Sequence, residues 1–369
     1  MLSAMSALER IKAIEEEMAR TQVNKATNRH LGVLRARIAK LRQQEQDRVT
    51  RGQGQRGDGY TVRKDGDSTV VLLGLPSVGK STLLNHLTNS KSKVGAYDFT
   101  TLTVIPGILK YGGANIQVLD IPGIIRGASH GKGLGKRILS ATRSADLILV
   151  VTDVFNPKMR NMLLNEIRAI GLRPDENPPN VIIEKRASGG IFITDMVGMT
   201  QMEHEGIKDI LREYRYHNSR VVIKEDISYD QFVDTLLKNT VYIPTLTVLN
   251  KIDMVDKEYV EELEKSLDHY VIPISADTDV NLERLKKEIF EHLDLIRIYM
   301  KPRREKADME EPMIVRNGST VGDIARMVHG DLRKRLRYSR IWGKSVKFGG
   351  QKVKAKHVPM DEDILTFYA

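Results

Sequence analysis

The octapeptide at residues 74–81 of this chain reads Gly-Leu-Pro-Ser-Val-Gly-Lys-Ser. It fits the pattern G-x-x-x-x-G-K-[ST] and follows the apolar run 69–73, so a strand, a tight glycine turn and a helix succeed one another. In that setting backbone N–H groups surround phosphates, Lys80 reaches the β- and γ-phosphates, and the Ser81 hydroxyl binds Mg²⁺. A chance match in a glycine-containing turn is the alternative. The predicted nucleoside triphosphate site comprises Gly74, Leu75, Pro76, Ser77, Val78, Gly79, Lys80, Ser81 and Thr82.

From residue 68 onwards, apolar runs alternate with amphipathic segments. Strands are expected over 68–73, 107–111, 115–120, 146–153, 243–249 and 270–274. Helices are expected over 80–89, 134–143, 158–170, 256–267 and 280–293. This alternation is typical of an open α/β sheet whose nucleotide loops lie at the strand ends.

The gap between residues 153 and 243 is much longer than the roughly 30 residues of a βαβ unit. Strands expected over 181–183, 189–194 and 220–224, with helices over 204–215 and 228–238, predict a small α+β insertion domain. Three methionines at helical spacing in this segment favour core packing over a ligand site: Met196, Met199 and Met202.

The two ends of the chain have patterns of their own. Residues 1–44 predict two helices with a break and helix cap at Thr27 and Asn28, and 50–59 predicts a flexible linker rather than an RNA-binding arm. After residue 293, strands over 295–299, 312–315 and 363–368 and a helix over 320–329 predict a compact sheet domain. The expected parts are a helical hairpin with linker (1–66), a split α/β domain (67–173 and 241–293), the insertion (174–240) and a C-terminal domain (294–369).

Further phosphate and metal contacts are expected from two short segments. Asp120 follows an apolar strand and can hold Mg²⁺ through water, while the Gly123 N–H can meet the γ-phosphate. Among the hydroxyls of 98–103 we assign Thr101 to the metal ahead of Thr100 and Thr103, although a threonine-rich strand would look the same. These segments add Phe99, Thr100, Thr101, Asp120, Ile121, Pro122 and Gly123 to the site, and catalysis is assigned to Lys80, Thr101 and Gly123.

The nucleotide base is indicated by Asn250, Lys251 and Asp253, which follow another apolar strand. Guanine offers N1–H and N2–H donors that one carboxylate accepts, whereas adenine does not, so Asp253 disfavours an ATP-using enzyme. Asn250 is expected at the opposite edge of the base and the Lys251 stem over its face. The segment Ser275, Ala276 and Asp277 completes the site, with a backbone N–H of Ser275 or Ala276 donating to guanine O6.

Composition bounds the partners and the compartment. The chain has no cysteine, which excludes disulfides, zinc–thiolate sites and thiol catalysis. With no signal peptide and no long apolar run, no membrane partner and a cytoplasmic location are expected. The net charge of +10, from 58 Lys and Arg against 48 Asp and Glu, indicates an anionic partner.

The positive charge is concentrated near the C-terminus. Residues 332–360 contain ten basic side chains and no acidic ones: Arg333, Lys334, Arg335, Arg337, Arg340, Lys344, Lys347, Lys352, Lys354 and Lys356. Interleaved Tyr338, Trp342 and Phe348 predict RNA phosphate contact with base stacking. The alternative is a solvated basic face with aromatics in the core, which we favour for Trp342. The predicted second helix is also basic, at Arg35, Arg37, Lys40 and Arg42.

The motifs at 74–82, 97–103 and 120–128 resemble those of Obg-type GTPases. The opening 9–41, including 15–22 and 24–28, is similar to the developmentally regulated GTP-binding proteins in particular. The resemblance covers nearly the whole chain. It implies a helical hairpin, an interrupted P-loop GTPase domain and a C-terminal TGS domain of ubiquitin-like fold. It also implies association with ribosomes and a stabilising partner of the DRG-family-regulatory type.

Ile124 stands where Ras-type switches carry the glutamine that orients the attacking water. We therefore expect slow intrinsic hydrolysis, with the water positioned by backbone, by a partner, or by Arg126, Ser129 or His130. Some relatives bind K⁺ through an asparagine that Ser77 replaces here, so K⁺ dependence stays open beside Mg²⁺. The expected function is a GTP/GDP switch on ribosomes, and the alternative is an RNA-bound scaffold in which GTP is structural.

Overall fold

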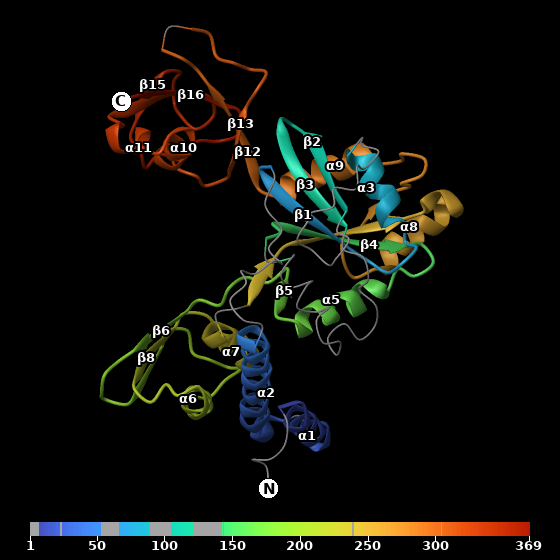
Figure 1. Cartoon of the computed structure of the whole chain (residues 1–369), viewed down its shortest axis with the longest axis vertical. Helices are drawn as coiled ribbons and strands as arrows, with labels where there is room; N and C mark the ends of the chain where they lie inside the picture. The colour runs from blue at the N-terminus through green and yellow to red at the C-terminus, as the bar shows by residue number, and fades with distance from the viewer. Residues whose placement is uncertain are drawn as a thin grey trace. The chain divides into compact units, whose positions relative to one another are not determined.

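The chain folds into two compact units, which Figure 1 shows in a computed structural model. One unit contains Met1–Asp58 and Glu176–Tyr242, and the other contains Gly59–Asp175 and Ile243–Ala369. The structure describes residues 7–22, 24–52, 66–88, 105–120, 142, 144–237, 240–303 and 305–369. The predicted helix 134–143 lies outside the described residues except for residue 142.

A six-stranded sheet forms the centre of the larger unit, in the order β11-β10-β4-β1-β3-β2. Its strands are β1 (Ser68–Leu73), β2 (Ile105–Tyr111), β3 (Ala114–Asp120), β4 (Leu147–Asp153), β10 (Thr245–Asn250) and β11 (Ile272–Pro273). All neighbours are parallel except β2, which runs antiparallel to β3. Every residue of β1 and β4 is buried, as expected of central parallel strands covered on both faces. The carboxyl ends of β1, β3, β4 and β10 therefore meet at one edge.

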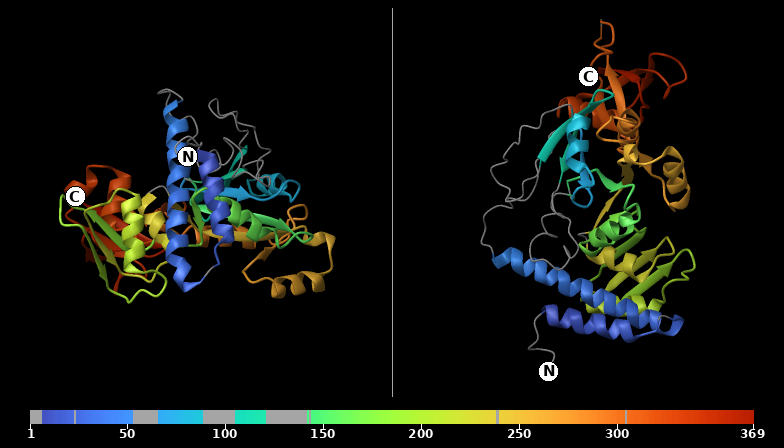
Figure 2. Two further views of the ribbon diagram at one scale, coloured as in Figure 1. Left: turned by 90° about the horizontal axis from the view of Figure 1, so that it is seen from below. Right: turned by 90° about the vertical axis from the view of Figure 1, so that its right-hand side faces the viewer.

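Helices cover this sheet, as Figures 1 and 2 show. They are α3 (Lys80–Thr88), α5 (Met159–Ala169), α8 (Lys257–Ser266) and α9 (Leu282–His292), with a 3-10 turn at Ile252–Met254. The apolar faces of α3 and α9 join Val70 and Leu72 of β1 in one core cluster. Because side chains alternate along a strand, the buried Val71 and Leu73 point to the other face. Two short strands, β5 (Leu172–Pro174) and β9 (Val241–Ile243), form a separate pair.

The C-terminal sheet has the order β13-β12-β16-β14-β15. Its elements are β12 (Leu295–Met300), β13 (Met313–Arg316), α10 (Val321–Val328), α11 (Leu332–Arg335), β14 (Tyr338–Trp342), β15 (Gln351–Val353) and β16 (Asp363–Tyr368). A capping box between Thr320 and Asp323 begins α10, which packs its apolar face on the inner side of the sheet. The sequence did not predict α11, β14 or β15, since their basic side chains mask the short apolar pattern.

The smaller unit combines the N-terminal hairpin with the inserted segment. Its elements are α1 (Ala7–Arg20), α2 (Lys25–Gly52), β6 (Val181–Lys185), β7 (Ile191–Asp195), α6 (His204–Glu213), β8 (Ser219–Ile223) and α7 (Tyr229–Leu237). The strands form a sheet in the order β6-β8-β7, and α1 lies beside α2 (Figure 2). Ala36 of α2 belongs to the same core cluster as Phe232 of α7, so hairpin and insertion share one core.

A close contact between α2 and α7 explains why Gly32 lies within α2. A Cβ at Gly32 would lie 2.6 Å from Cγ of Tyr229, and one at Gly206 would lie 2.3 Å from the Tyr229 hydroxyl. The Tyr229 ring therefore occupies a slot that only glycine leaves open on both sides. The Glu203 N–H donates to its hydroxyl at 3.1 Å, which satisfies the buried polar end.

The structure corrects three sequence predictions in this unit. The break comes before Thr27 and Asn28, because α1 ends at Arg20 and α2 begins at Lys25, where Asn24 and Thr27 exchange two hydrogen bonds and cap the helix. The linker was predicted to begin at residue 50, but α2 continues to Gly52 through polar residues that favour helix. Met202 is buried and Met199 half-buried, but Met196 is 64% exposed in a loop and fills no core. No helix within the described ranges is long and apolar enough to cross a membrane.

Candidate functional site

The loop after β1 has the backbone shape that its glycines predict. Ser77 and Gly79 both have left-handed backbone, with φ of 64° and 92°. A Cβ at Gly79 would lie 2.3 Å from Nδ2 of Asn250, and one at Gly74 would lie 2.5 Å from the Val151 carbonyl oxygen. Both glycines are therefore required by close approach, and not only by chain reversal.

Lys80 begins α3 and points back into the loop. Its ammonium group donates to the carbonyl oxygens of Gly74 and Leu75 at 3.0 and 2.8 Å. Burial lowers the pKa of Lys80, and the nearby Asp120 carboxylate partly offsets that effect. An ammonium with three donors and two carbonyl partners keeps one proton for an incoming phosphate.

Ser81 and Asp120 meet at the ends of α3 and β3. The Ser81 hydroxyl donates to Oδ2 of Asp120 at 2.9 Å. Asp120 is only 4% exposed, and its Oδ1 accepts no hydrogen bond from any described residue. A buried carboxylate oxygen without a donor beside a hydroxyl is a fitting place for a hard cation such as Mg²⁺. Among the described residues, no group of three or more histidine, aspartate or glutamate side chains is placed to hold a metal ion by itself.

Several predicted site residues lie outside the described residues. They are Phe99, Thr100, Thr101, Thr103, Ile121, Pro122 and Gly123, together with Ile124, Arg126, Ser129 and His130. Their assignments to metal, γ-phosphate and catalytic water therefore stay predictions. Thr82 lies in the first turn of α3, directly after Ser81.

Asn250 ties the phosphate loop to the far side of the site. It is 2% exposed at the end of β10. Its Nδ2 donates to the Val78 carbonyl at 2.9 Å, and its Oδ1 accepts the Ala276 N–H at 3.0 Å. One side chain thus fixes the distance between two nucleotide loops.

Lys251 adds a second connection between the same loops. It has left-handed backbone, with φ of 67°, and its ammonium donates to the Ser77 carbonyl at 2.7 Å. Asp153, at the end of β4, lies 3.6 Å from that ammonium and also accepts from the Asn156 backbone. Asp153 was not predicted as a site residue, although an acidic residue at the end of a central strand is a usable signal. The Ser77 carbonyl and the Asp153 carboxylate together hold the Lys251 side chain where its stem can lie along a bound base.

The guanine-reading residues take different positions. Asp253 is exposed within the 3-10 turn, and no described residue donates to its carboxylate. We predicted that the N–H of Ser275 or Ala276 donates to guanine O6. In the structure, the Ser275 N–H donates to the Val280 carbonyl and the Ala276 N–H donates to Asn250 Oδ1, so neither group is free for the base. The adjacent Asp277, also a predicted site residue, is exposed in the same turn.

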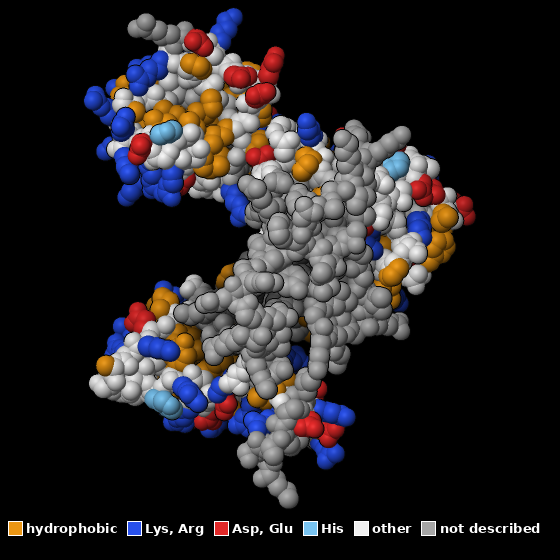
Figure 3. Space-filling view, in the orientation of Figure 1, with side chains coloured by type: hydrophobic (Ala, Val, Ile, Leu, Met, Phe, Trp, Pro, Cys, Tyr) orange, Lys and Arg blue, Asp and Glu red, His pale blue; other side chains and the backbone are white. Residues whose placement is uncertain are grey.

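The basic C-terminal stretch forms a cationic face on its sheet, where Figure 3 shows lysine and arginine side chains gathered. Tyr338 and Tyr368 are cross-strand partners whose rings stack 4.6 Å apart at 11°. Lys352 covers the Tyr338 ring at 4.5 Å, and Arg303 covers that of Tyr368 at 4.9 Å. The stacked pair therefore presents cations and ring edges rather than open ring faces.

The other two aromatics of the stretch differ from each other. Trp342 is half-buried, with Lys301 at 4.6 Å over its ring and the Gly349–Gly350 turn against it. It is thus sandwiched at the sheet surface instead of lying in the core, which corrects our prediction. Phe348 alone is widely open, at 66% exposure.

Comparisons with known proteins agree with this geometry. Three family models match successive parts of the chain. They are "50S ribosome-binding GTPase" over residues 69–186, "C-terminal region of MMR_HSR1 domain" over 188–295, and "TGS domain" over 296–369. An uncharacterized GTP-binding protein of Methanocaldococcus jannaschii is 49% identical over 97% of this chain and 92% of its own.

Relatives from eukaryotes match over a similar length. Developmentally-regulated G-protein 3 of Arabidopsis thaliana is 43% identical over 97% of both chains. Developmentally-regulated GTP-binding protein 1 of Xenopus laevis is 42% identical over 97% of this chain and 98% of its own. Among solved structures, the YchF GTPase of Schizosaccharomyces pombe covers 83% of this chain and 99% of its own, at 16% identity and a TM-score of 0.45.

Proposed function

Since this chain belongs to the family of developmentally regulated GTP-binding proteins, we propose that it is a GTP-hydrolysing switch that acts on ribosomes. Its central domain is a GTPase domain and its C-terminal domain a TGS domain. The observation that carries the proposal is the pair of hydrogen bonds made by the Asn250 side chain, which we call the Asn250 bracket. They join the phosphate loop at Val78 to the base loop at Ala276. A nucleotide held at both ends by one rigid frame fits that arrangement.

The phosphates are assigned to the loop at 74–82. Lys80 neutralises charge on the β- and γ-phosphates, and Ser81 with Asp120 would hold Mg²⁺, which neutralises the charge that develops on the phosphate oxygens. Asp120 would hold the ion through water, and its Oδ1, which accepts no hydrogen bond from any described residue, is the atom available for that contact. Thr101 is proposed as the second hydroxyl ligand, and the Gly123 N–H as the γ-phosphate donor.

The base is assigned to the β10 side. The Asp253 carboxylate accepts the N1–H and N2–H of guanine, and the Lys251 stem, held by Ser77 and Asp153, lies along the ring. Asp277 takes the place of Ser275 and Ala276 as the N–H donor to guanine O6. GTP and GDP are the expected ligands, and adenine nucleotides are rejected at Asp253.

Hydrolysis by the chain alone is expected to be slow. Ile124 has no polar atom that orients water, so a regulatory protein of the DRG-family-regulatory type or the ribosome would complete the site. Whether K⁺ contributes is tested by comparing turnover in K⁺ and in Na⁺, because Ser77 offers only a hydroxyl and backbone carbonyls. Equal rates in the two salts would exclude a K⁺ role.

The ribosome contact is assigned to the cationic face of the TGS domain. Its stacked tyrosines are covered by Lys352 and Arg303, which favours RNA phosphates over bases as the ligand. The family model matched at 69–186 also carries a ribosome-binding description. Binding to ribosomes would place the chain in the cytoplasm.

The test is GTP turnover by the full chain, alone and with purified ribosomes. We expect ribosomes to raise turnover, Lys80→Ala to abolish it, and neutralising Lys344, Lys347, Lys352 and Lys354 to remove the ribosome effect only. If Lys80→Ala keeps full cellular function without turnover, the chain is instead an RNA-bound scaffold in which GTP is structural. Unchanged ribosome binding after the lysine changes would refute the assignment of the TGS face.

A further inference from the structure

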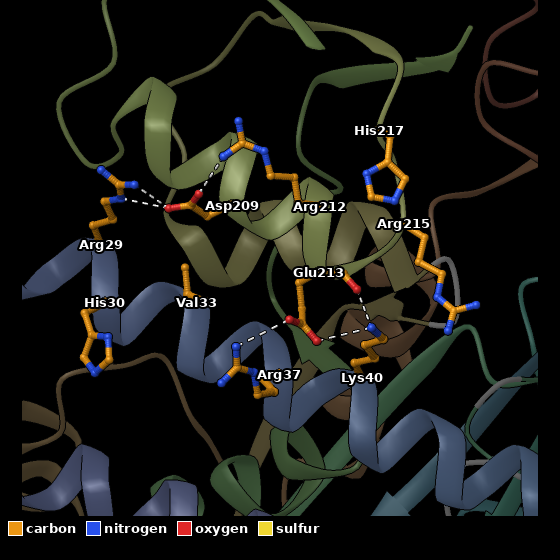
Figure 4. Close-up of a pocket in the computed structure, with 10 residues that line it drawn as sticks. All are labelled: Arg29, His30, Val33, Arg37, Lys40, Asp209, Arg212, Glu213, Arg215 and His217. Carbon is orange, nitrogen blue, oxygen red and sulfur yellow. Dashed lines mark hydrogen bonds and ion pairs between the residues drawn. The ribbon is translucent and has the colours of Figure 1, made fainter. Parts of the chain in front are cut away.

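A charged cavity of about 730 Å³ lies between α2 and α6, within the smaller unit (Figure 4). Five basic side chains line it: Arg29, Arg37, Lys40, Arg212 and Arg215. Asp209 and Glu213 are the acidic side chains among the described lining residues, so this lining carries a formal net charge of +3 with its two histidines neutral. The cavity lies outside the nucleotide-binding residues described above.

The two carboxylates are each shared between two cations. Asp209 accepts from Arg29 Nε at 2.9 Å and from Arg212 at 3.1 Å. Glu213 lies 3.5 Å from Arg37 and 3.2 Å from Lys40. The acids therefore hold the side chains in position but leave a surplus of positive charge.

Arg215 supplies part of that surplus. It follows α6 with left-handed backbone, φ of 61°, and its side chain is exposed with no carboxylate partner among the described residues. Figure 4 shows it beside Lys40 at one end of the cavity. A free guanidinium next to a preformed row of cations is suited to a multiply charged anion.

We propose that this cavity binds the phosphodiester backbone of an RNA. Among the described residues that line the cavity, Val33 is the one apolar side chain, and none is phenylalanine, tyrosine or tryptophan. Peptide recognition relies on apolar pockets and base recognition on ring stacking, so neither is served here. Guanidinium groups that present paired N–H donors suit repeated phosphates.

This site extends the proposed function by giving the RNA a second contact, and it depends on that function only for the identity of RNA as the partner. The test uses the full chain and a fluorescein-labelled oligouridylate, with binding followed by anisotropy across a range of KCl concentrations. The cavity variant combines Arg37→Gln with Arg215→Gln. The matched control combines Arg220→Gln with Lys224→Gln, which removes the same charge from exposed positions at β8 of the same unit, outside the cavity lining.

Each single-strand phosphate contact contributes about 0.7 to the slope of log affinity against log salt. Two lost contacts should lower the slope by about 1.4, so that the loss of affinity between 50 and 200 mM salt is about sevenfold smaller than for the unmodified chain. The control pair should keep the original slope. Thermal melting of each variant verifies that the fold is retained.

Three outcomes would overturn the proposal. Equal slopes for cavity and control variants would show that the cavity contacts no phosphate. Displacement of the oligouridylate by an oligoglutamate of equal charge, at equal potency, would make the cavity a general anion or peptide site. Loss of binding only when the TGS lysines are neutralised would refute the cavity while leaving the proposed function intact, whereas no RNA binding by the unmodified chain would refute both RNA assignments.

Discussion

Asn250→Ala is the substitution that most sharply tests how the two nucleotide loops are held. It removes two buried hydrogen bonds, of 2.9 and 3.0 Å, and leaves the Val78 carbonyl and the Ala276 N–H without partners. An unpaired buried backbone group costs about 1–3 kcal/mol, so the bracket contributes about 2–6 kcal/mol. Loops no longer fixed at one spacing are competent to bind for only part of the time, which weakens apparent affinity. The lower limit of about 2 kcal/mol corresponds to about thirtyfold.

The assay for this variant is calorimetric titration of GDP, together with amide hydrogen exchange at Ala276. Exchange should accelerate because that N–H loses its acceptor. Thr152→Val is the matched control, since it deletes a buried 3.1 Å hydrogen bond to the Val248 carbonyl within the same sheet. It should reduce stability by about 1 kcal/mol and leave GDP affinity unchanged. GDP binding by Asn250→Ala within threefold of the unmodified chain would refute the bracket.

Two further changes test other parts of the structure. Gly32→Ala places a Cβ 2.6 Å from the confined Tyr229 ring, which should cost about 1–3 kcal/mol of overpacking. That cost should outweigh the gain of about 1 kcal/mol in helix propensity, so the melting temperature of the smaller unit should fall. In the control variant Gly330→Ala, the new Cβ meets no atom within 4 Å. Equal melting of the two variants would contradict this packing. Because burial lowers the pKa of Lys80, the unfolded chain binds more protons just below the ordinary lysine pKa of about 10.4, and the free energy of unfolding should rise with pH in that window. Urea unfolding of Lys80→Met should lack that increment, and identical pH slopes would count against it.

The nucleotide side of the fold is readable from sequence because phosphate and base contacts impose fixed spacings. Residues 74–81 must join a strand to a helix, and the structure places Leu73 at the end of β1 and Lys80 at the start of α3. The apolar runs predicted most core strands because parallel strands are buried on both faces. The end of α2 was predicted less well, because its polar C-terminal residues extend the helix to Gly52, eight residues beyond the predicted end at 44.

Contacts between distant segments could not be read in the same way. That Asn250 uses the Ala276 N–H, and so removes it from the base, depends on how β10 and the loop after β11 meet. The pairing of Asp209 with Arg29 brings together residues of the hairpin and the insertion, which sequence suggested as two separate parts. Covered tyrosine faces likewise depend on the register of β14 and β16. Local pattern therefore predicts residues and their chemistry, but not which hydrogen-bonding groups remain free.

Asp253→Asn tests whether the Asp253 carboxylate selects guanine. The exposed carboxylate takes no hydrogen bond from any described residue, so the change should leave the fold intact. Each lost hydrogen bond to a charged acceptor is worth about 1.5–3 kcal/mol, so two should weaken GDP binding by at least about a hundredfold. The asparagine amide can donate to the 2-oxo group of xanthine, and xanthosine diphosphate should become the preferred ligand. Unchanged GDP affinity, with no gain for xanthosine diphosphate, would contradict the account.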